Sequence, residues 1–235
     1  QKEHDGNRIQ GMIMSKLCID LCAGKGGFSR AFTEDPTWEV ITVELNKKQK
    51  PTICADVRHL PIKENLCPEA LLMSPPCERN SIACSQWPKK GIQLAMEIVG
   101  ACLEAVVFLK PKKWILENPK GRLRWFMQVP PKSTINYCDY DACYRTVKAT
   151  DFWGNVSLPM VKKQNPLKIG HVESGWFRKG GGWDIPRDAA SRAEIPIGVS
   201  LLTTLTGNIT ASLIPHDILF LIAFSNFPVG ITCKK

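Results

Sequence analysis

The sequence predicts an α/β protein built around a Rossmann-like, doubly wound and mostly parallel sheet. Two observations lead to this fold class. Short apolar runs alternate with longer amphipathic stretches, which is typical of parallel strands connected by helices on both faces of a sheet. The composition, with 44% hydrophobic and 23% charged residues among 235, indicates a folded, soluble chain and excludes collagen-like, coiled-coil and wholly disordered proteins.

The expected elements follow this alternation along the chain. We expect strands at residues 16–21, 39–44, 70–73, 114–116 and 134–138, because each is a short apolar run. The clearest helix is expected at residues 91–109, and a shorter one should carry residues 29–33. Residues 51–54 are strand-like.

The texture of the sequence divides the chain into four parts. Residues 1–11 are polar and unpatterned, which indicates a disordered arm or an expression remnant. Residues 12–156 carry the alternating pattern and form the main domain. Residues 157–192 are rich in Pro, Gly and Lys and form a short basic segment. Residues 193–235 form a C-terminal segment that we expect to pack back on the main domain.

The charge of the chain favours a polyanionic partner. Lys and Arg number 31 against 22 Asp and Glu, which gives a net charge of +9, so nucleic acid is the first hypothesis. In the basic segment the alternative is a solvated loop with ordinary charges. The side chains that would hold phosphates or stack on bases are Lys162, Lys163, Lys168, Arg178, Lys179, Trp153, Trp176 and Trp183.

The ten cysteines do not suggest a metal site or a disulfide framework. No Cys-x-x-Cys occurs, no histidine stands at zinc-like spacing, and no secretory leader is visible, so we expect an intracellular chain without metal. The longest apolar run, residues 218–224, is far below the roughly 20 residues of a membrane helix. We expect no membrane segment, and a monomer located in the cytoplasm or with the DNA.

A glycine-rich loop follows the first expected strand. Residues 20–28 read Asp-Leu-Cys-Ala-Gly-Lys-Gly-Gly-Phe, and glycines at this place allow a sharp turn and a close approach of a ligand. For a glycine-rich loop considered by itself, a tight turn without a ligand is about as frequent as a ligand-binding turn. Glu44 ends the second strand and Asp56 follows the third, where carboxylates can accept ribose hydroxyls and an adenine amino group. No Walker Lys-Ser or Lys-Thr follows, so the loop favours an adenosine-containing cofactor over a triphosphate.

Two further strands deliver reactive groups to the same edge of the sheet. Cys77 follows Ser74-Pro75-Pro76 after the strand at 70–73, and Glu117 follows the strand at 114–116. The carboxyl ends of neighbouring parallel strands converge on one site. The alternatives are a cysteine that acts as a small buried hydrophobe and a glutamate at the surface.

The order of these motifs resembles that of the DNA cytosine-5 methyltransferases over about residues 16–155. Residues 20–28 look like the family's cofactor loop, Glu44 and Asp56 like its ribose and adenine acids, and Pro75-Pro76-Cys77 with Ser81 like its nucleophile loop. Residues 117–119, Glu-Asn-Pro, are similar to the family's Glu-Asn-Val. Of its Gln-x-Arg-x-Arg strand only Arg145 is represented, and Gly207-Asn208 is similar to its C-terminal Gly-Asn.

The resemblance implies the fold of S-adenosylmethionine-dependent methyltransferases, with a short target-recognition segment. It implies methylation of carbon 5 of cytosine in DNA, with Cys77 adding to carbon 6, Glu117 at N3 and Arg145 at the carbonyl oxygen. The base would leave the duplex, and S-adenosylhomocysteine would be the product. The implied cofactor-binding residues are Asp20, Cys22, Ala23, Gly24, Lys25, Gly26, Gly27, Glu44, Leu45, Asp56, Val57 and Pro76.

Two other functions remain open at this stage. Ser74-Pro75-Pro76 also matches the start of the Ser-Pro-Pro-Tyr loop of enzymes that methylate exocyclic amino groups of cytosine or adenine, although Cys77 in place of the aromatic argues against that class. A catalytically silent nucleic-acid-binding protein of the same fold is the other alternative. RNA as the substrate is not excluded, because nothing in the sequence indicates recognition of a sugar hydroxyl.

Overall fold

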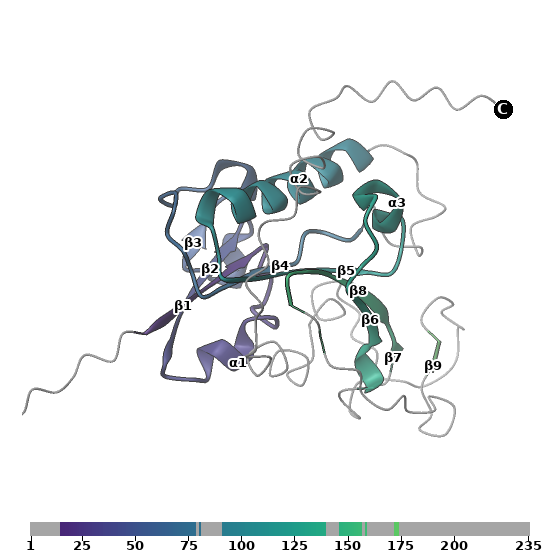
Figure 1. Cartoon of the computed structure of the whole chain (residues 1–235), viewed down its shortest axis with the longest axis horizontal. Coiled ribbons are helices and arrows are strands. Elements are labelled where there is room, and N and C mark those ends of the chain that lie inside the picture. The colour runs from purple at the N-terminus through teal and green to yellow at the C-terminus, as the bar shows by residue number, and fades with distance from the viewer. Residues whose placement is uncertain are drawn as a thin grey trace, which may run out of the picture.

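A computed structural model describes residues 15–78, 80, 91–139, 146–156, 158 and 172–173. Its centre is a seven-stranded sheet of order β3-β2-β1-β4-β5-β8-β6 (Figure 1). The first five are mutually parallel: β1 (Lys16–Leu21), β2 (Trp38–Glu44), β3 (Ile53–Cys54), β4 (Ala70–Met73) and β5 (Lys113–Pro119). β8 (Ala149–Gly154) runs antiparallel to β5 and to β6 (Ser133–Asn136). The predicted mostly parallel α/β fold is confirmed.

Helices cover both faces of this sheet. The long helix α2 (Ile92–Leu109) lies on one face and the short helix α1 (Arg30–Thr33) on the other (Figure 1). Successive side chains of a strand point to opposite faces, so Ile19 and Leu21 of β1 join the apolar cluster under α2, whereas Cys18 joins the cluster with Phe32 of α1. This double burial explains why β4 is apolar at every position.

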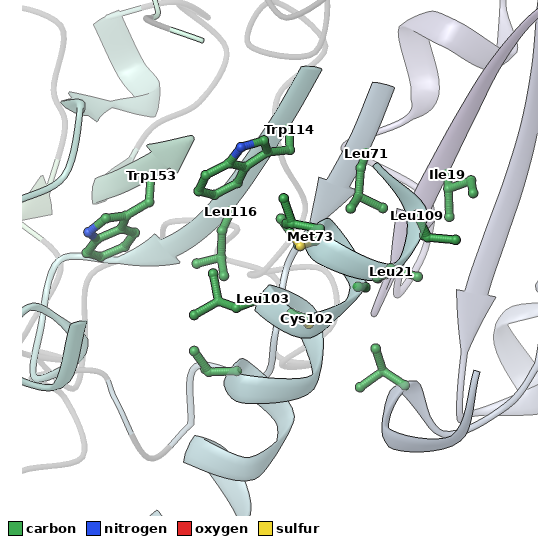
Figure 2. Close-up of a cluster of buried hydrophobic side chains, with 14 of the residues drawn as sticks. Ile19, Leu21, Leu71, Met73, Cys102, Leu103, Leu109, Trp114, Leu116 and Trp153 are labelled. Atoms are coloured by element: carbon green, nitrogen blue, oxygen red, sulfur yellow. The ribbon is translucent and has the colours of Figure 1, made fainter. Parts of the chain in front are cut away.

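Helix α2 is a core helix. By length and composition it could cross a membrane, but half of it is buried inside the protein. Figure 2 shows Cys102, Leu103 and Leu109 of α2 beside the apolar side chains of the central strands. Packing against the sheet explains the apolar character of α2. Trp153 lies in the same cluster with 3% of its surface exposed, so the prediction that it stacks on bases is wrong.

The remaining described elements are short. Helix α3 (Leu123–Met127) follows β5, and the two-stranded pair of β7 (Thr146–Val147) and β9 (Val172–Glu173) stands outside the main sheet. Three 3-10 turns, η1, η2 and η4, span Lys47–Gln49, Val57–His59 and Tyr137–Asp139.

Several elements differ from the sequence prediction. The strands at 16–21 and 70–73 have the predicted bounds, but β5 extends to Pro119 and the strand predicted at 134–138 ends at Asn136. The reason is β8, which was not predicted: it pairs with β5 along Ile115–Pro119 and with all of β6. The segments 1–11 and 193–235 lie outside the described residues, as does 157–192 except for 158, 172 and 173.

A buried ion pair ties α3 to the edge of the sheet. Asp151 of β8 is fully buried, and both of its oxygens accept hydrogen bonds from the guanidinium of Arg124. The hydroxyl of Thr134 on β6 also donates to Asp151, at 2.8 Å. A buried carboxylate is tolerated because these donors satisfy it.

We predict that Arg124→Met destabilises the protein by about 3–5 kcal/mol, because it leaves the Asp151 charge buried without its partner. Urea unfolding followed by circular dichroism measures this loss. The matched control is Arg30→Met, which breaks the exposed Arg30–Glu34 pair and should cost less than about 1 kcal/mol. Equal losses in the two variants would contradict a structural role for the buried pair.

Candidate active site at the carboxyl edge of the sheet

The order of the strands places the candidate site at the carboxyl ends of β1 and β4. The chain proceeds outward from β1 to β3 and then returns to continue with β4 on the other side of β1. In an open α/β sheet such a reversal leaves a crevice beyond the strand ends, where ligands bind. The glycine loop follows β1 and the Cys77 loop follows β4, so both predicted loops lie at this edge of the sheet.

The glycine loop is tight and open toward its ligand side. Cys22, Gly24 and Gly26 all have positive φ, at 56°, 54° and 74°, and the amide of Gly26 donates to the carbonyl of Ala23 at 2.8 Å. A Cβ atom on Gly24 would meet nothing within 4 Å. The left-handed backbone favours glycine, and the space beside Gly24 is open.

Glu44 is fixed beside this loop by backbone donors. Its Oε2 accepts from the amide of Gly24 at 3.0 Å, and its Oε1 accepts from the amide of Asn46 at 2.9 Å. Each carboxylate oxygen has a second lone pair, so Glu44 can still accept the two hydroxyls of a ribose. The next residue, Leu45, is 67% exposed and offers an apolar surface at the same place.

Asp56, which the sequence predicts as an acceptor for an adenine amino group, already accepts hydrogen bonds from Arg58. It caps η2 by accepting from the amide of Arg58 at 2.9 Å, and the Arg58 guanidinium contacts both of its oxygens. Hydrogen bonds from Arg58 lower the pKa of Asp56 to about 2. Arg58 also reaches Glu97 of α2 at 3.2 Å. An adenine amino group would therefore share Asp56 with Arg58.

Asp20 is a buried acid next to the glycine loop. Burial raises its pKa to about 7, and the charge of Glu44 adds to this rise, while Ser29 lowers it only in part. Neither of its oxygens is in good hydrogen-bonding geometry with a residue in the described part of the chain. A buried carboxyl group in this state favours a polar ligand with a hydrogen-bond donor.

The loop that carries Cys77 is attached to both neighbouring strands. The amide of Ser74 donates to the carbonyl of Leu21 at 3.1 Å, and the buried side chain of Asn118 donates to the carbonyl of Pro75 at 3.0 Å. Two prolines restrict the backbone just before Cys77. The half-buried thiol is therefore held at the strand ends by contacts to β1 and β5.

Glu117 lies at the end of β5 with 5% of its surface exposed. The hydroxyl of Tyr137 donates to its Oε1 at 2.7 Å, and Nζ of Lys148 lies 3.8 Å from the same oxygen. Burial raises the pKa of Glu117, while Lys148 and Tyr137 oppose this rise. The site can thus hold a carboxyl group that exchanges a proton.

Cys77 and Glu117 influence each other's protonation. Burial, and then the negative charge of Glu117, raise the pKa of Cys77 to about 11, whereas Lys148 works in the opposite direction. A proton on Glu117 removes the repulsion and makes the thiolate easier to form. The protonation state of Glu117 therefore affects how readily Cys77 ionises.

Two residues of this cluster were missed from the sequence. The sequence predicts Tyr137 within a strand and indicates no role for it or for Lys148. Arg145 and Ser81 lie outside the described residues. Lys148 is the only Lys or Arg in the sequence between Arg145 and Lys162, and this isolation is the one sequence feature that indicates a role for it. Tyr137 had no signal of its own, because its contact with Glu117 spans 20 residues.

Comparisons with known proteins found a curated relative and solved structures of low sequence identity. No protein-family model matches the chain. A curated relative, the "Probable DNA (cytosine-5)-methyltransferase" of Frog virus 3 (isolate Goorha), is 27% identical over 154 residues, which are 59% of this chain and 70% of the relative.

Two solved structures are similar at a lower level. One, named as a DNA modification methyltransferase encoded within an E. coli prophage, has 18% identity and a TM-score of 0.44 and covers 60% of this chain. The other, the Entamoeba histolytica methyltransferase EhMeth, has 14% identity and a TM-score of 0.42 over 60% of this chain. The chain spans about half the length of each, 46% and 52%.

We predict that Glu117→Gln lowers the pKa of Cys77, because it removes a nearby negative charge that disfavours the thiolate. At pH 8 iodoacetamide should then alkylate Cys77 at least about threefold faster than in the unchanged protein. Peptide mass spectrometry across a pH series measures the rate, with exposed Cys54 as the internal reference. An unchanged rate at Cys77 would mean that the two groups are not coupled.

Proposed function

We propose that the protein is an S-adenosylmethionine-dependent methyltransferase that modifies carbon 5 of cytosine in DNA through a covalent adduct of Cys77. The observation that carries this proposal is that the Cys77 loop and buried Glu117 follow neighbouring parallel strands, β4 and β5, at the same edge of the sheet. A nucleophile and a proton donor beside each other are what activation of a cytosine ring requires. The name of the viral relative supports the same reaction.

The residues around the glycine loop fit the cofactor. The open space at Gly24 would admit the part of the cofactor that lies against the backbone of the loop. Glu44 would accept hydrogen bonds from the ribose hydroxyls of the cofactor, and Leu45 would pack on its adenine. Asp20, which is buried without a well-placed partner, would accept from a donor of the bound molecule. When bound, S-adenosylmethionine supplies an electrophilic methyl group. The other proposed contacts are Cys22, Ala23, Lys25, Gly26, Gly27, Asp56, Val57 and Pro76.

The chain's own residues would prepare the base. The thiolate of Cys77 adds to carbon 6, and the electron pair of the 5,6 double bond forms a 4,5 double bond. The electron pair of the 3,4 double bond moves to N3, which takes the proton of Glu117. After carbon 5 has received the methyl group, carbon 5 loses its proton to solvent and the bond between Cys77 and carbon 6 breaks. N3 then returns its proton to Glu117. Arg145 is proposed at the carbonyl oxygen of the ring.

DNA is the proposed partner because the net charge of +9 would attract a polyanion and the viral relative is named a DNA (cytosine-5)-methyltransferase. The target base must leave the stack before Cys77 can reach carbon 6. The basic segment 157–192 is proposed to bind the phosphates of the DNA and to act as a short target-recognition segment. The protein is proposed to act as a monomer in the compartment that holds the DNA. Residues 12–156 would then form the catalytic domain.

The covalent step is tested with DNA that contains 5-fluorocytosine and with labelled S-adenosylmethionine. Fluorine at carbon 5 cannot leave as a proton does, so the protein should remain attached to the DNA through Cys77. Cys77→Ala should form neither adduct nor 5-methylcytosine, and Glu117→Gln should slow transfer by about 10²–10⁴-fold. Denaturing gels and nucleoside analysis provide the measurements.

Other results would point to other functions. Normal product formation by Cys77→Ala would overturn the covalent mechanism and favour methylation of an exocyclic amino group. Absence of any methylated nucleoside with DNA and with RNA, despite binding, would favour a silent binding protein.

The cofactor site is tested by calorimetry. Glu44→Ala should weaken S-adenosylmethionine binding by about 1–3 kcal/mol, because it removes a hydrogen-bond acceptor. Asp56→Ala should weaken it as well, with a smaller loss where Arg58 already occupies the carboxylate. Glu34→Ala, an exposed acid on another part of the chain, is the matched control. If both Glu44 and Asp56 variants bind with full affinity, the placement of the cofactor is wrong.

A further inference from the structure

Two donors from different parts of the chain converge on one oxygen of Glu117. The hydroxyl of Tyr137, at the start of η4, lies 2.7 Å from Oε1, and Nζ of Lys148, just before β8, lies 3.8 Å from the same atom. The ammonium group also lies 4.8 Å from the centre of the Tyr137 ring. Tyr137 is fully buried and Glu117 nearly so, so these contacts are little screened by water.

These contacts make the two oxygens of the carboxyl group unequal. An ammonium group has only donors, so the oxygen that faces it must act as an acceptor. A proton on Oε1 would point toward a positive charge and would compete with the phenol hydroxyl. A proton on Oε2 avoids both conflicts and leaves Oε1 free to accept.

We propose that Tyr137 and Lys148 are positioning residues that keep Oε1 of Glu117 as an acceptor, so that the acid carries its proton on Oε2 and presents it to N3 of the base. This inference rests on the proposed base methylation for its role, but not for its physical basis. The proton passes from Oε2 to N3 when Cys77 adds to the ring, and it returns to Oε2 when Cys77 leaves.

The titratable groups around Glu117 set the sign of the expected effects. Tyr137 and Lys148 favour the charged carboxylate, and Asp151 of β8 disfavours it. Cys77, after β4, is coupled to the same carboxyl group. Removing the Tyr137 hydroxyl or the Lys148 charge therefore raises the pKa of Glu117 further above its ordinary value.

A role in packing predicts a different result. Tyr137→Phe keeps the ring in the core and keeps its contact with Lys148, and it removes only the hydroxyl. A packing residue changed in this way would leave the pKa of Glu117 where it was. The titration thus separates positioning of the proton from filling of space.

The decisive experiment is a carboxyl titration by NMR of protein labelled with ¹³C at the glutamate side chains. The Glu117 signal is the one that Glu117→Gln removes, and the measurement needs no turnover. The pKa of Glu117 should rise in Tyr137→Phe and in Lys148→Met. In Lys148→Arg, which keeps the positive charge, the pKa of Glu117 should equal that in the unchanged protein. Lys112→Met removes the exposed lysine partner of Glu69 and should leave Glu117 unchanged.

Single-turnover methylation gives the functional readout. Tyr137→Phe should slow 5-methylcytosine formation about 10-fold, part of the usual value of general acid help, with unchanged affinity for S-adenosylmethionine. One limb of the pH–rate profile should disappear in Glu117→Gln. In Tyr137→Phe the same limb should lie at higher pH than in the unchanged protein.

The outcomes separate this inference from the proposed function. An unchanged or lowered pKa of Glu117 in Tyr137→Phe overturns the inference even if the protein methylates cytosine. Absence of 5-methylcytosine from the unchanged protein overturns the proposed function, while the titration still decides the arrangement on Oε1. If Tyr137→Phe does not fold, Lys148→Met and Lys148→Arg test the same oxygen.

Discussion

The burial of the Glu117 carboxyl group at the end of β5 is the constraint on which the rest of the site depends. A carboxylate that is almost fully removed from water is unstable unless donors and a positive charge surround it. Tyr137 and Lys148 supply these contacts, and both reach one oxygen. The same burial raises the pKa of Glu117 above its ordinary value, and the charge of Glu117 helps to raise the pKa of Cys77.

The antiparallel strand β8 makes this burial possible. Phe152 of β8 stands opposite Glu117 in the register, and β8 separates β5 from β6. Lys148 precedes β8 directly, and Tyr137 follows β6, so the inserted strand brings both side chains to the end of β5. The Arg124–Asp151 pair holds this part of the sheet to α3. Stability at this edge and chemistry at Glu117 therefore depend on the same strand.

The two halves of the site are prepared to different degrees. Around the glycine loop, Glu44 is already oriented by two backbone amides and the space at Gly24 is open, which favours binding without a large rearrangement. Asp56 is engaged by Arg58, and the thiol of Cys77 is protonated at neutral pH because its pKa is about 11. The proposed mechanism therefore requires a change of charge at Cys77, and a proton on Glu117 would favour it by removing a negative charge that raises the pKa of Cys77.

The sequence by itself determined the parallel part of the fold and most of the candidate residues, because these are encoded in local patterns. Apolar runs located β1, β4 and α2, and Cys77 and Glu117 could be placed at one edge because each directly follows a buried strand. The tertiary structure decided the rest. β8 pairs antiparallel with β5 and β6, Tyr137 meets Glu117 across 20 residues of sequence, and the pKa directions of Asp20, Cys77 and Glu117 follow from burial. Contact partners and desolvation belong to the packed molecule, which is why periodicity and motif order could not reveal them.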